Sequence, residues 1–326
     1  MNNIKIGDKI LNTKVSLAPM AGITDYVLRN LVRKHSKTCL ITTEMISSEA
    51  LVQVPHANII NRADDHSPIA YQLSGHKPEM MARAAKILEQ YADIIDINMG
   101  CPVNKVVRGQ DGCALMRNPA LAASLVTEIK ANISKPVSVK FRLGYHADDL
   151  NFVEYGVKMQ EAGADFITIH GRTRSQFYAG SADWAKIKDL KNNVTIPVFA
   201  NGDILSVDNA IECMEQSGAD GVAVGRGVLG DVTLISRIEH YFLTGEKVPP
   251  PSLEERIETL KIHLIEEIKL RGEDVGIKFT RKFYPYYINS IKDAAKYRAI
   301  LVREENYDKI IKLLDELCTN KNECLS

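Results

Sequence analysis

A cysteine in a rigid turn is the first residue whose setting indicates chemistry. Cys101 lies between Gly100 and Pro102, directly after the apolar run Asp93–Asn98. Glycine permits unusual backbone angles and proline stiffens the loop, so the turn would present a thiol at the end of a strand. A thiol held there can act as a nucleophile or as a proton donor. The other cysteines are scattered, with no Cys-x-x-Cys pair and no histidine cluster, which argues against a metal site or a disulfide framework.

A lysine at the end of another apolar run is the second candidate. Lys140, with Arg142 two residues later, ends the run Val137–Phe141. Three roles are open for its ammonium group. It can pair with a carboxylate such as Asp96 or Glu44, it can be a fixed cation beside an anionic cofactor or intermediate, or it can form a Schiff base. Position in the sequence does not separate these roles.

The run Phe166–His170 delivers a third group of polar side chains. It ends in His170, and Arg172 and Arg174 follow on the same segment. A histidine at the end of a strand is often a packed core residue. With Arg172 beside it, contact with a ligand is the favoured interpretation.

Two glycine-containing segments have the composition of a phosphate site. Asn201-Gly202-Asp203 follows the run Pro197–Ala200, and Gly225-Arg226-Gly227 follows the run Gly221–Val224. Glycine lets backbone N–H groups approach a phosphate closely, and Arg226 would supply a charge-assisted donor. Together the two segments predict a phosphorylated ligand.

The elements that must position these groups are short apolar runs that alternate with helical patterns. Repeated strand-then-helix units imply a parallel sheet, and eight of them within about 240 residues suit a closed (β/α)8 barrel of the TIM type, an α/β fold. No Gly-x-Gly-x-x-Gly follows the first run, which argues against a dinucleotide-binding open sheet. The predicted strands are Val15–Ala18, Leu40–Thr43, Ile69–Leu73, Asp93–Asn98, Val137–Phe141, Phe166–His170, Pro197–Ala200 and Gly221–Val224.

In such a barrel the active site lies at the C-terminal ends of the strands, and phosphates bind after strands seven and eight. This brings all the groups above to one rim, together with Pro19-Met20-Ala21 after the first strand and Gln72 in the third. The helices predicted between the strands begin at a Thr24 N-cap and run to about Lys34, and then cover Lys77–Tyr91, Asn118–Ile133, Leu150–Ala162, Trp184–Leu190 and Ser206–Ser217.

The pattern changes near residue 248. Pro249-Pro250-Pro251 breaks the chain, and the remaining residues have a helical pattern without a strand candidate, including Leu253–Leu270 and Tyr307–Leu317. We therefore expect a barrel over residues 1–248 and an all-helical C-terminal domain over residues 249–326.

Composition is that of an ordinary globular protein. The chain has 326 residues, 45% hydrophobic, with 41 basic and 41 acidic side chains, so its net charge gives no support for a nucleic-acid partner. No apolar run is long enough to span a membrane and the start has no signal-peptide core. We expect a cytoplasmic protein that binds no membrane and needs no obligate protein partner.

The distribution of charge is more informative than its sum. Between Gly276 and Arg303 there are seven basic residues and one acidic residue, Asp293, with aromatic residues interspersed. Basic groups reach phosphates and exposed aromatics stack on unpaired bases, so this segment predicts an RNA-binding face with outward cations and mostly buried aromatics. The basic residues are Lys278, Arg281, Lys282, Lys292, Lys296, Arg298 and Arg303; Lys105, Arg108, Arg172 and Arg174 would extend the surface to the Cys101 turn.

Five motifs in order resemble a known family, the tRNA-dihydrouridine synthases, along essentially the whole chain. The similarity is greatest to the bacterial branch of B type. The motifs are Leu17-Ala18-Pro19-Met20-Ala21-Gly22-Ile23-Thr24-Asp25, Asp96-Ile97-Asn98-Met99-Gly100-Cys101-Pro102 with Lys105-Val106, Thr168-Ile169-His170-Gly171-Arg172-Thr173-Arg174, Ala200-Asn201-Gly202-Asp203-Ile204 and Gly225-Arg226.

The resemblance implies an FMN-containing barrel followed by a helical tRNA-binding domain. By position, it implies that Pro19, Met20 and Ala21 line the flavin ring, that Gln72 and Lys140 bind its edge, and that Asn201, Gly202, Asp203, Gly225 and Arg226 hold the ribityl chain and phosphate. His170 would contact flavin or substrate, and Asn98 the uracil edge. Lys105, Arg172, Arg174, Lys282 and Arg298 are the candidate tRNA contacts.

The same resemblance implies two half-reactions. NADPH reduces FMN, and the reduced flavin passes a hydride to carbon 6 of a uridine in tRNA while Cys101 protonates carbon 5. Cys101 must then be a thiol at the moment of transfer, so a strongly lowered pKa would be unfavourable.

Three other interpretations fit parts of the sequence. An FMN barrel acting on free pyrimidines would share the flavin site without needing the basic tail. A Schiff-base aldolase would use Lys140 and leave Cys101 idle. A non-catalytic RNA-binding module would need neither, although Cys101, Lys140 and the phosphate segments are all intact.

Overall fold

The structure is a computed structural model that describes residues 3–54, 67–289, 291 and 293–319. Within these residues eight parallel strands close into a barrel, because the last strand pairs with the first and β4 pairs with β6. This confirms the predicted TIM-type fold. The strands are β3 (Val15–Leu17), β4 (Leu40–Thr42), β6 (Ile69–Ser74), β7 (Ile94–Asn98), β8 (Val137–Arg142), β11 (Phe166–His170), β12 (Val198–Asn201) and β13 (Gly221–Val224), with a short β5 (Ile46–Ser47) beside β6.

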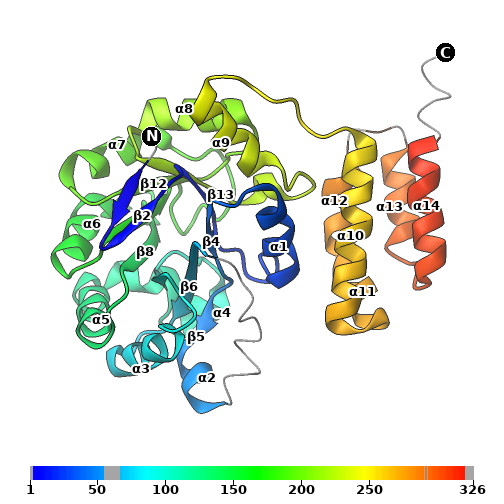
Figure 1. Ribbon diagram of the computed structural model, residues 1–326. Helices are drawn as coiled ribbons and strands as arrows, with labels where there is room; N and C mark the ends of the chain where they lie inside the picture. Colours follow the sequence, from blue (N-terminus) through cyan, green and yellow to red (C-terminus); the bar gives the residue numbers. More distant parts are fainter. Residues whose placement is uncertain (1–2, 55–66, 290, 292, 320–326) are drawn as a thin grey trace.

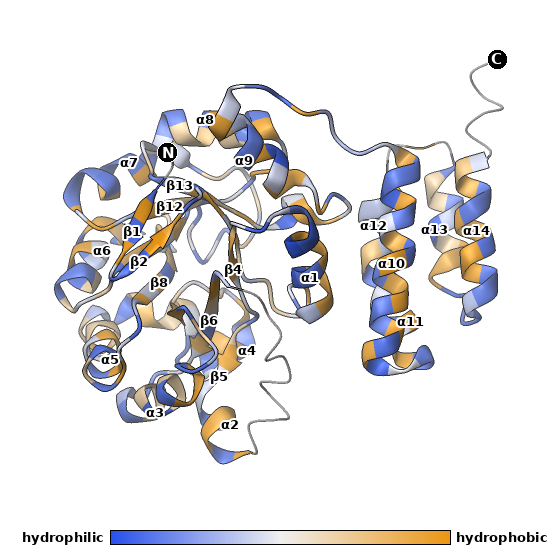
Figure 2. Cartoon of the chain, in the orientation of Figure 1, coloured by the Kyte–Doolittle hydropathy of each residue, from blue (hydrophilic) through white to orange (hydrophobic). Residues whose placement is uncertain are grey.

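The barrel is closed at its N-terminal end by a hairpin that the sequence did not predict. Strands β1 (Ile4–Ile6) and β2 (Lys9–Leu11) are antiparallel, and their apolar side chains pack with Phe166 and Phe199 inside the barrel. The strands are largely hydrophobic and lie inside the ring of helices (Figure 2). Since this end is sealed, the opposite rim is where a ligand can enter.

Helices surround the barrel as predicted (Figure 1), with one correction and three additions. The cap of the first helix is Asp25, whose side chain accepts from the Leu28 N–H, whereas Thr24 Oγ1 accepts from the Met20 N–H. The helices over Ser48–Gln53, Asn104–Arg108 and Leu234–Thr244 were not predicted. The helices are α1 (Tyr26–His35), α2 (Ser48–Gln53), α3 (Pro78–Leu88), α4 (Asn104–Arg108), α5 (Pro119–Asn132), α6 (Phe152–Glu161), α7 (Trp184–Asn193), α8 (Val207–Ser217) and α9 (Leu234–Thr244).

The rest of the described chain is helical. Helix α10 begins with a capping box in which Ser252 and Glu255 exchange side chain–backbone hydrogen bonds. The boundary predicted near residue 248 falls in the non-helical segment before it, and α10 lies beside α1 (Figure 1). The helices are α10 (Leu253–Arg271), α11 (Glu273–Thr280), α12 (Tyr284–Tyr287), α13 (Ala294–Leu301) and α14 (Tyr307–Thr319). None of the helices in the described ranges is long and apolar enough to cross a membrane.

Candidate active site

A cavity of about 450 Å³ opens at the C-terminal ends of the barrel strands. Its lining holds the Cys101 turn and Asn98. It also includes three cations, Lys140, Arg142 and Arg226. All the residues predicted to bind a cofactor line it: Pro19, Met20, Ala21, Gln72, Lys140, His170, Asn201, Gly202, Asp203, Gly225 and Arg226.

The Cys101 turn is held by Asn98. The side-chain oxygen of Asn98 accepts from the Cys101 N–H at 3.0 Å, and its amide nitrogen donates to Gln72 Oε1 at 2.8 Å. A Cβ at Gly100 would lie 3.2 Å from the backbone of Phe141, so a side chain there would have to displace that backbone by a few tenths of an ångström. The thiol of Cys101 is half-buried, and burial raises its pKa against the opposing effects of the Val103 N–H and nearby cations. Cys101 is therefore a protonated thiol at neutral pH, which suits a proton donor better than a nucleophile.

Lys140 makes no ion pair with either described carboxylate that the sequence offered as a partner, although Asp96 is close enough to oppose the lowering of its pKa. Asp96 accepts from Gln72 at 2.7 Å and from Ser138 at 2.5 Å, and Glu44 accepts from the Gly22 N–H. The Lys140 ammonium group instead donates to Asn201 Oδ1 at 3.1 Å. Burial, with a smaller contribution from Arg142, lowers the pKa of Lys140 to about 8.

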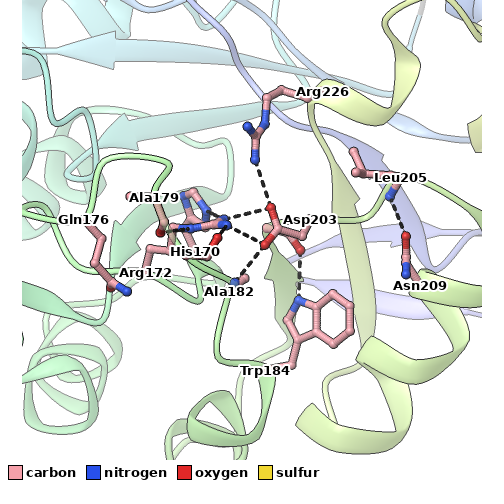
Figure 3. Close-up of polar contacts among 12 residues, drawn as sticks. His170, Arg172, Gln176, Ala179, Ala182, Trp184, Asp203, Leu205, Asn209 and Arg226 are labelled. Atoms are coloured by element: carbon pink, nitrogen blue, oxygen red, sulfur yellow. Dashed lines mark hydrogen bonds and ion pairs between the residues drawn. The ribbon is translucent and has the colours of Figure 1, made fainter.

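Asp203 is the centre of a network that fixes the segment after β12 (Figure 3). Both of its oxygens accept from Arg172, at 2.9 and 2.5 Å, and one also accepts from Arg226 at 2.9 Å. Burial alone would raise the pKa of Asp203, but hydrogen bonds from Arg172 and from the Ala182 N–H lower it below its usual value. Trp184 supports the same segment by donating to the Gly202 carbonyl at 2.8 Å.

His170 lies beneath this segment as a neutral imidazole. Burial first, and then the surrounding cations, lower its pKa well below the usual value. Its ring packs so close to Gly202 that a Cβ there would lie 2.8 Å from a ring carbon, and the φ of Gly202 is +118°. Only glycine fits at this point of the cavity wall.

The predicted phosphate segments offer unused donors. Within the described residues, the backbone N–H groups of Gly225 and Arg226 donate no hydrogen bond. A Cβ on Gly225 would meet no atom closer than 3.7 Å, so the space in front of this backbone is open. Free N–H groups beside Arg226 are suited to bind an anion.

The residues predicted to contact RNA are dispersed. Lys105 is exposed on α4, and Arg174 donates to Asn104 at 2.5 Å while it stacks on Tyr145. The guanidinium of Arg172 is buried and engaged by Asp203, so it is not presented to the surface as the sequence interpretation expected.

The two tail residues are also engaged within the chain. Lys282 donates to the Gly22 carbonyl of the barrel, and Arg298 donates to the Ile288 carbonyl at 2.9 Å. The mixture of buried aromatics and outward cations holds in part, since Phe283, Tyr284 and Tyr287 are buried. Lys292 and Cys324 lie outside the described residues.

Several lining residues were not among the predicted contacts. Arg142 donates to the Gly100 carbonyl at 2.9 Å and so supports the Cys101 turn. Strand alternation places it on the same face as Lys140, which was a usable signal. Tyr178, Met45 and Tyr286 also line the cavity, and Tyr286 comes from the helical domain. No sequence pattern around these three residues identifies them as part of the cavity lining. In the part of the chain that the structure describes, no group of His, Cys, Asp and Glu could hold a metal ion.

Comparison with protein families gives one match that covers almost all of the chain. Residues 16–322 match the model of the dihydrouridine synthase (Dus) family. The chain is similar to "Probable tRNA-dihydrouridine synthase 1" of Synechocystis sp., with 39% identity over 99% of this chain and 91% of that protein. It is also similar to "tRNA-dihydrouridine synthase B" of Pseudomonas aeruginosa (36% identity; 94% and 93%) and of Shewanella oneidensis (35%; 97% and 100%).

Among solved structures, the fold resembles an old yellow enzyme homologue from Zymomonas mobilis. The TM-score is 0.50 and the identity 12%, over 78% of this chain and 95% of that one. At this identity the likeness supports the barrel fold alone.

Proposed function

The chain belongs to the dihydrouridine synthase family, and we propose that it reduces the 5,6-double bond of uridines in tRNA to dihydrouridine, with FMN as cofactor and NADPH as reductant. One observation carries the proposal beyond the family match. A protonated thiol, Cys101, lies in the same cavity as a lysine with a lowered pKa and an anion-binding segment.

The donors and charges of the cavity lining suit a flavin mononucleotide. Gly225 leaves its wall open, and the free N–H groups there with Arg226 suit the phosphate. Gln72 and Lys140 offer amide and ammonium groups for the polar edge of the ring, Asn201 would hold the ribityl chain, and Pro19-Met20-Ala21 line the same cavity. Its lining contains three cations and one carboxylate, Asp203, which favours an anionic cofactor.

When bound and reduced by NADPH, the flavin supplies the hydride for carbon 6 of the uracil ring. The Cys101 thiol gives its proton to carbon 5, so the double bond becomes single and the thiolate regains a proton from solvent. Asn98 and Arg142 hold the turn that carries Cys101. The Lys140 cation stabilises negative charge at the edge of the ring.

The target base must leave its stack to reach this cavity, at a cost of a few kcal/mol. Lys105 and Arg174 beside the Cys101 turn are proposed RNA contacts on the barrel, and Asn98 is proposed to meet the uracil edge. Exposed cations of the helical domain are proposed to contact the tRNA backbone.

The direct test is the dihydrouridine content of tRNA from a host that lacks its own synthases. We expect dihydrouridine when this chain is expressed. With Cys101→Ala we expect product formation to fall by about 100-fold to 10,000-fold, the range for loss of a general acid. Mass spectrometry of digested tRNA measures both.

A matched control separates the thiol's role from folding. Cys213 is a buried thiol on α8, away from the cavity lining, and Cys213→Ala should keep activity. A flavin-loaded protein that forms no dihydrouridine would contradict the tRNA assignment and make free pyrimidines the next substrates to assay.

A further inference from the structure

Two cations of the helical domain hold the barrel loop that forms one wall of the active-site cavity. We call residues 18–25 the rim loop; Ala18, Pro19, Met20, Ala21 and Ile23 line the cavity. From α10, Arg271 pairs with Asp25 at 2.5 Å, and from the segment after α11, Lys282 donates to the Gly22 carbonyl. The contacts join segments about 250 residues apart, where α10 lies beside α1 (Figure 1).

A displacement at one end of the rim loop would also displace the residues that line the cavity, because hydrogen bonds connect the residues of the loop to one another. The N–H groups of Ile23 and Thr24 both donate to the Met20 carbonyl at 2.9 Å, and the Met20 N–H donates to Thr24 Oγ1 at 2.9 Å. Gly22 has a φ of +72° and donates to Glu44. A shift at Gly22 or Asp25 therefore moves Met20 and Ala21 with it.

Arg271 joins two buried carboxylates across the domain boundary. Its Nε donates to Glu267 at 2.6 Å and its Nη2 to Asp25, and Glu267 is fully buried. Burial and the neighbouring Glu267 raise the pKa of Asp25. Two adjacent carboxylates repel each other, so the guanidinium between them keeps this contact closed.

Lys282 is half-buried, and its side chain lies against the same contact. Its ammonium group lies 3.1 Å from the ring centroid of Phe279, and burial lowers its pKa. A lysine that binds an RNA phosphate needs an extended, hydrated side chain. Here the side chain is folded onto the barrel, which assigns it a different role from the one its sequence position indicated.

We propose that Arg271 and Lys282 are positioning residues for the flavin reaction: the helical domain, through them, sets the position of the rim loop and so the geometry of the flavin site. The domain is then part of the redox machinery of the barrel as well as a surface for RNA. The inference rests on the proposed function, because it requires a flavin in the cavity.

The test is the reduction of bound flavin by NADPH in the absence of RNA, together with the visible circular dichroism of the flavin. In Lys282→Met we expect an altered flavin spectrum and reduction slowed by between about 3-fold and 100-fold, since a misplacement near 1 Å can cost about 100-fold. Lys282→Arg, which can still donate to Gly22, should restore most of the rate. The matched control is Lys269→Met, an exposed lysine of α10 paired with Glu266.

Arg271 provides a second variant with a graded expectation. Arg271→Gln removes the cation between Asp25 and Glu267 and should slow RNA-free reduction at least as much as Lys282→Met, and Arg271→Lys should be intermediate. Thermal melts show whether each variant is folded. If Arg271→Gln is not folded, the result for Lys282→Met decides the test, because that substitution leaves no buried carboxylate unpaired.

Two results would overturn the inference without touching the proposed function. One is a Lys282→Met protein with the spectrum and RNA-free reduction rate of Lys269→Met. The other is a defect of Lys282→Met confined to the KM for tRNA, which would make Lys282 an RNA contact. A parent protein that carries no flavin, or forms no dihydrouridine, would instead contradict the proposed function.

Discussion

The barrel rim and the helical domain both carry many cations, but they use them in different ways. At the rim, Lys140 and Arg142 from β8 and Arg226 from the segment after β13 converge on one cavity. In the helical domain, the described cations of the basic segment between Gly276 and Arg303 point in different directions. Arg298 donates back into its own domain, whereas Lys296 is exposed.

The difference follows from how each region fixes a side chain. The end of a barrel strand is set by the ladder, and alternation sets which face a residue occupies, so a cation at a strand end has one direction. A cation on a short helix can turn to solvent or inward, depending on what packs against that helix. Convergence indicates a ligand site at the rim, whereas in the helical domain each cation has to be judged by its contacts.

The largest expected effect concerns the rim cation that does not face the cavity. Arg172 is 1% exposed and paired with Asp203, so Arg172→Met would leave a partly buried carboxylate with one guanidinium partner fewer. We expect the free energy of unfolding to fall by about 3 kcal/mol, at the lower end of the cost of breaking a buried pair because Arg226 remains. Urea denaturation of the flavin-free protein measures this.

Arg174→Met is the matched comparison on the same segment. Arg174 is half-buried and hydrogen-bonded to Asn104, with no carboxylate partner among the described residues, so its loss should cost no more than about 1 kcal/mol. If the two variants are equally stable and Arg172→Met weakens only tRNA binding, the original interpretation of Arg172 as an RNA contact is correct.

An intermediate effect is expected from the titration of Lys140. Burial lowers its pKa to about 8, so its positive charge is present below that pH and lost above it. Flavin reduction by NADPH should fall by up to about tenfold per pH unit above pH 8. Lys140→Met should be slow at pH 7 and lack this decline, and Lys140→Arg, which stays charged, should lack it as well.

The pH dependence of stability has the opposite sign to that of flavin reduction. The pKa of Lys140 is below its unfolded value of 10.5, so the unfolded chain binds more protons between about pH 8 and 10.5. The stability of the parent protein relative to Lys140→Met should therefore rise with pH across that window. A pH-independent difference between the two would mean that Lys140 is not titrating there.

The sequence predicted the barrel well because each strand is a buried apolar run bounded by glycine or polar residues. The eight strands lie within two residues of the predicted limits. Their ends are where the cavity forms, and for this reason all the residues predicted as cofactor contacts line it. The N-terminal hairpin was not predicted, because its strands have three residues each and no helical pattern follows them to mark a strand-then-helix unit.

Contacts made by side chains on loops and short helices were beyond the sequence. Tyr178 lines the cavity from the loop after β11, stacked on Arg226 at 4.9 Å, and no spacing rule marks it. Arg172 was placed on the correct loop, but its inward turn depends on Asp203, from the next strand. Lys282 belonged to a basic segment typical of RNA binding, and only its packing on Phe279 and Gly22 distinguishes it.

The smallest expected effect concerns the cations of the helical domain that do point to solvent. Lys296 and Arg303 are exposed and have no ion-pair partner within the residues described. If they bind tRNA phosphates, each contact is worth about four- to fivefold in affinity near 0.15 M salt, from the release of counterions. Lys296→Ala and Arg303→Ala should each weaken tRNA binding by that factor and lower the slope of log affinity against log salt by about 1.

Lys188→Ala, on the outer helix α7, is the control and should change neither the affinity nor the slope. RNA-free flavin reduction should stay at the parent rate in all three, whereas Lys282→Met slows it. If Lys296 and Arg303 leave the salt dependence unchanged, the tRNA lies on another face of the helical domain, and charge density along the sequence is a poor guide to it.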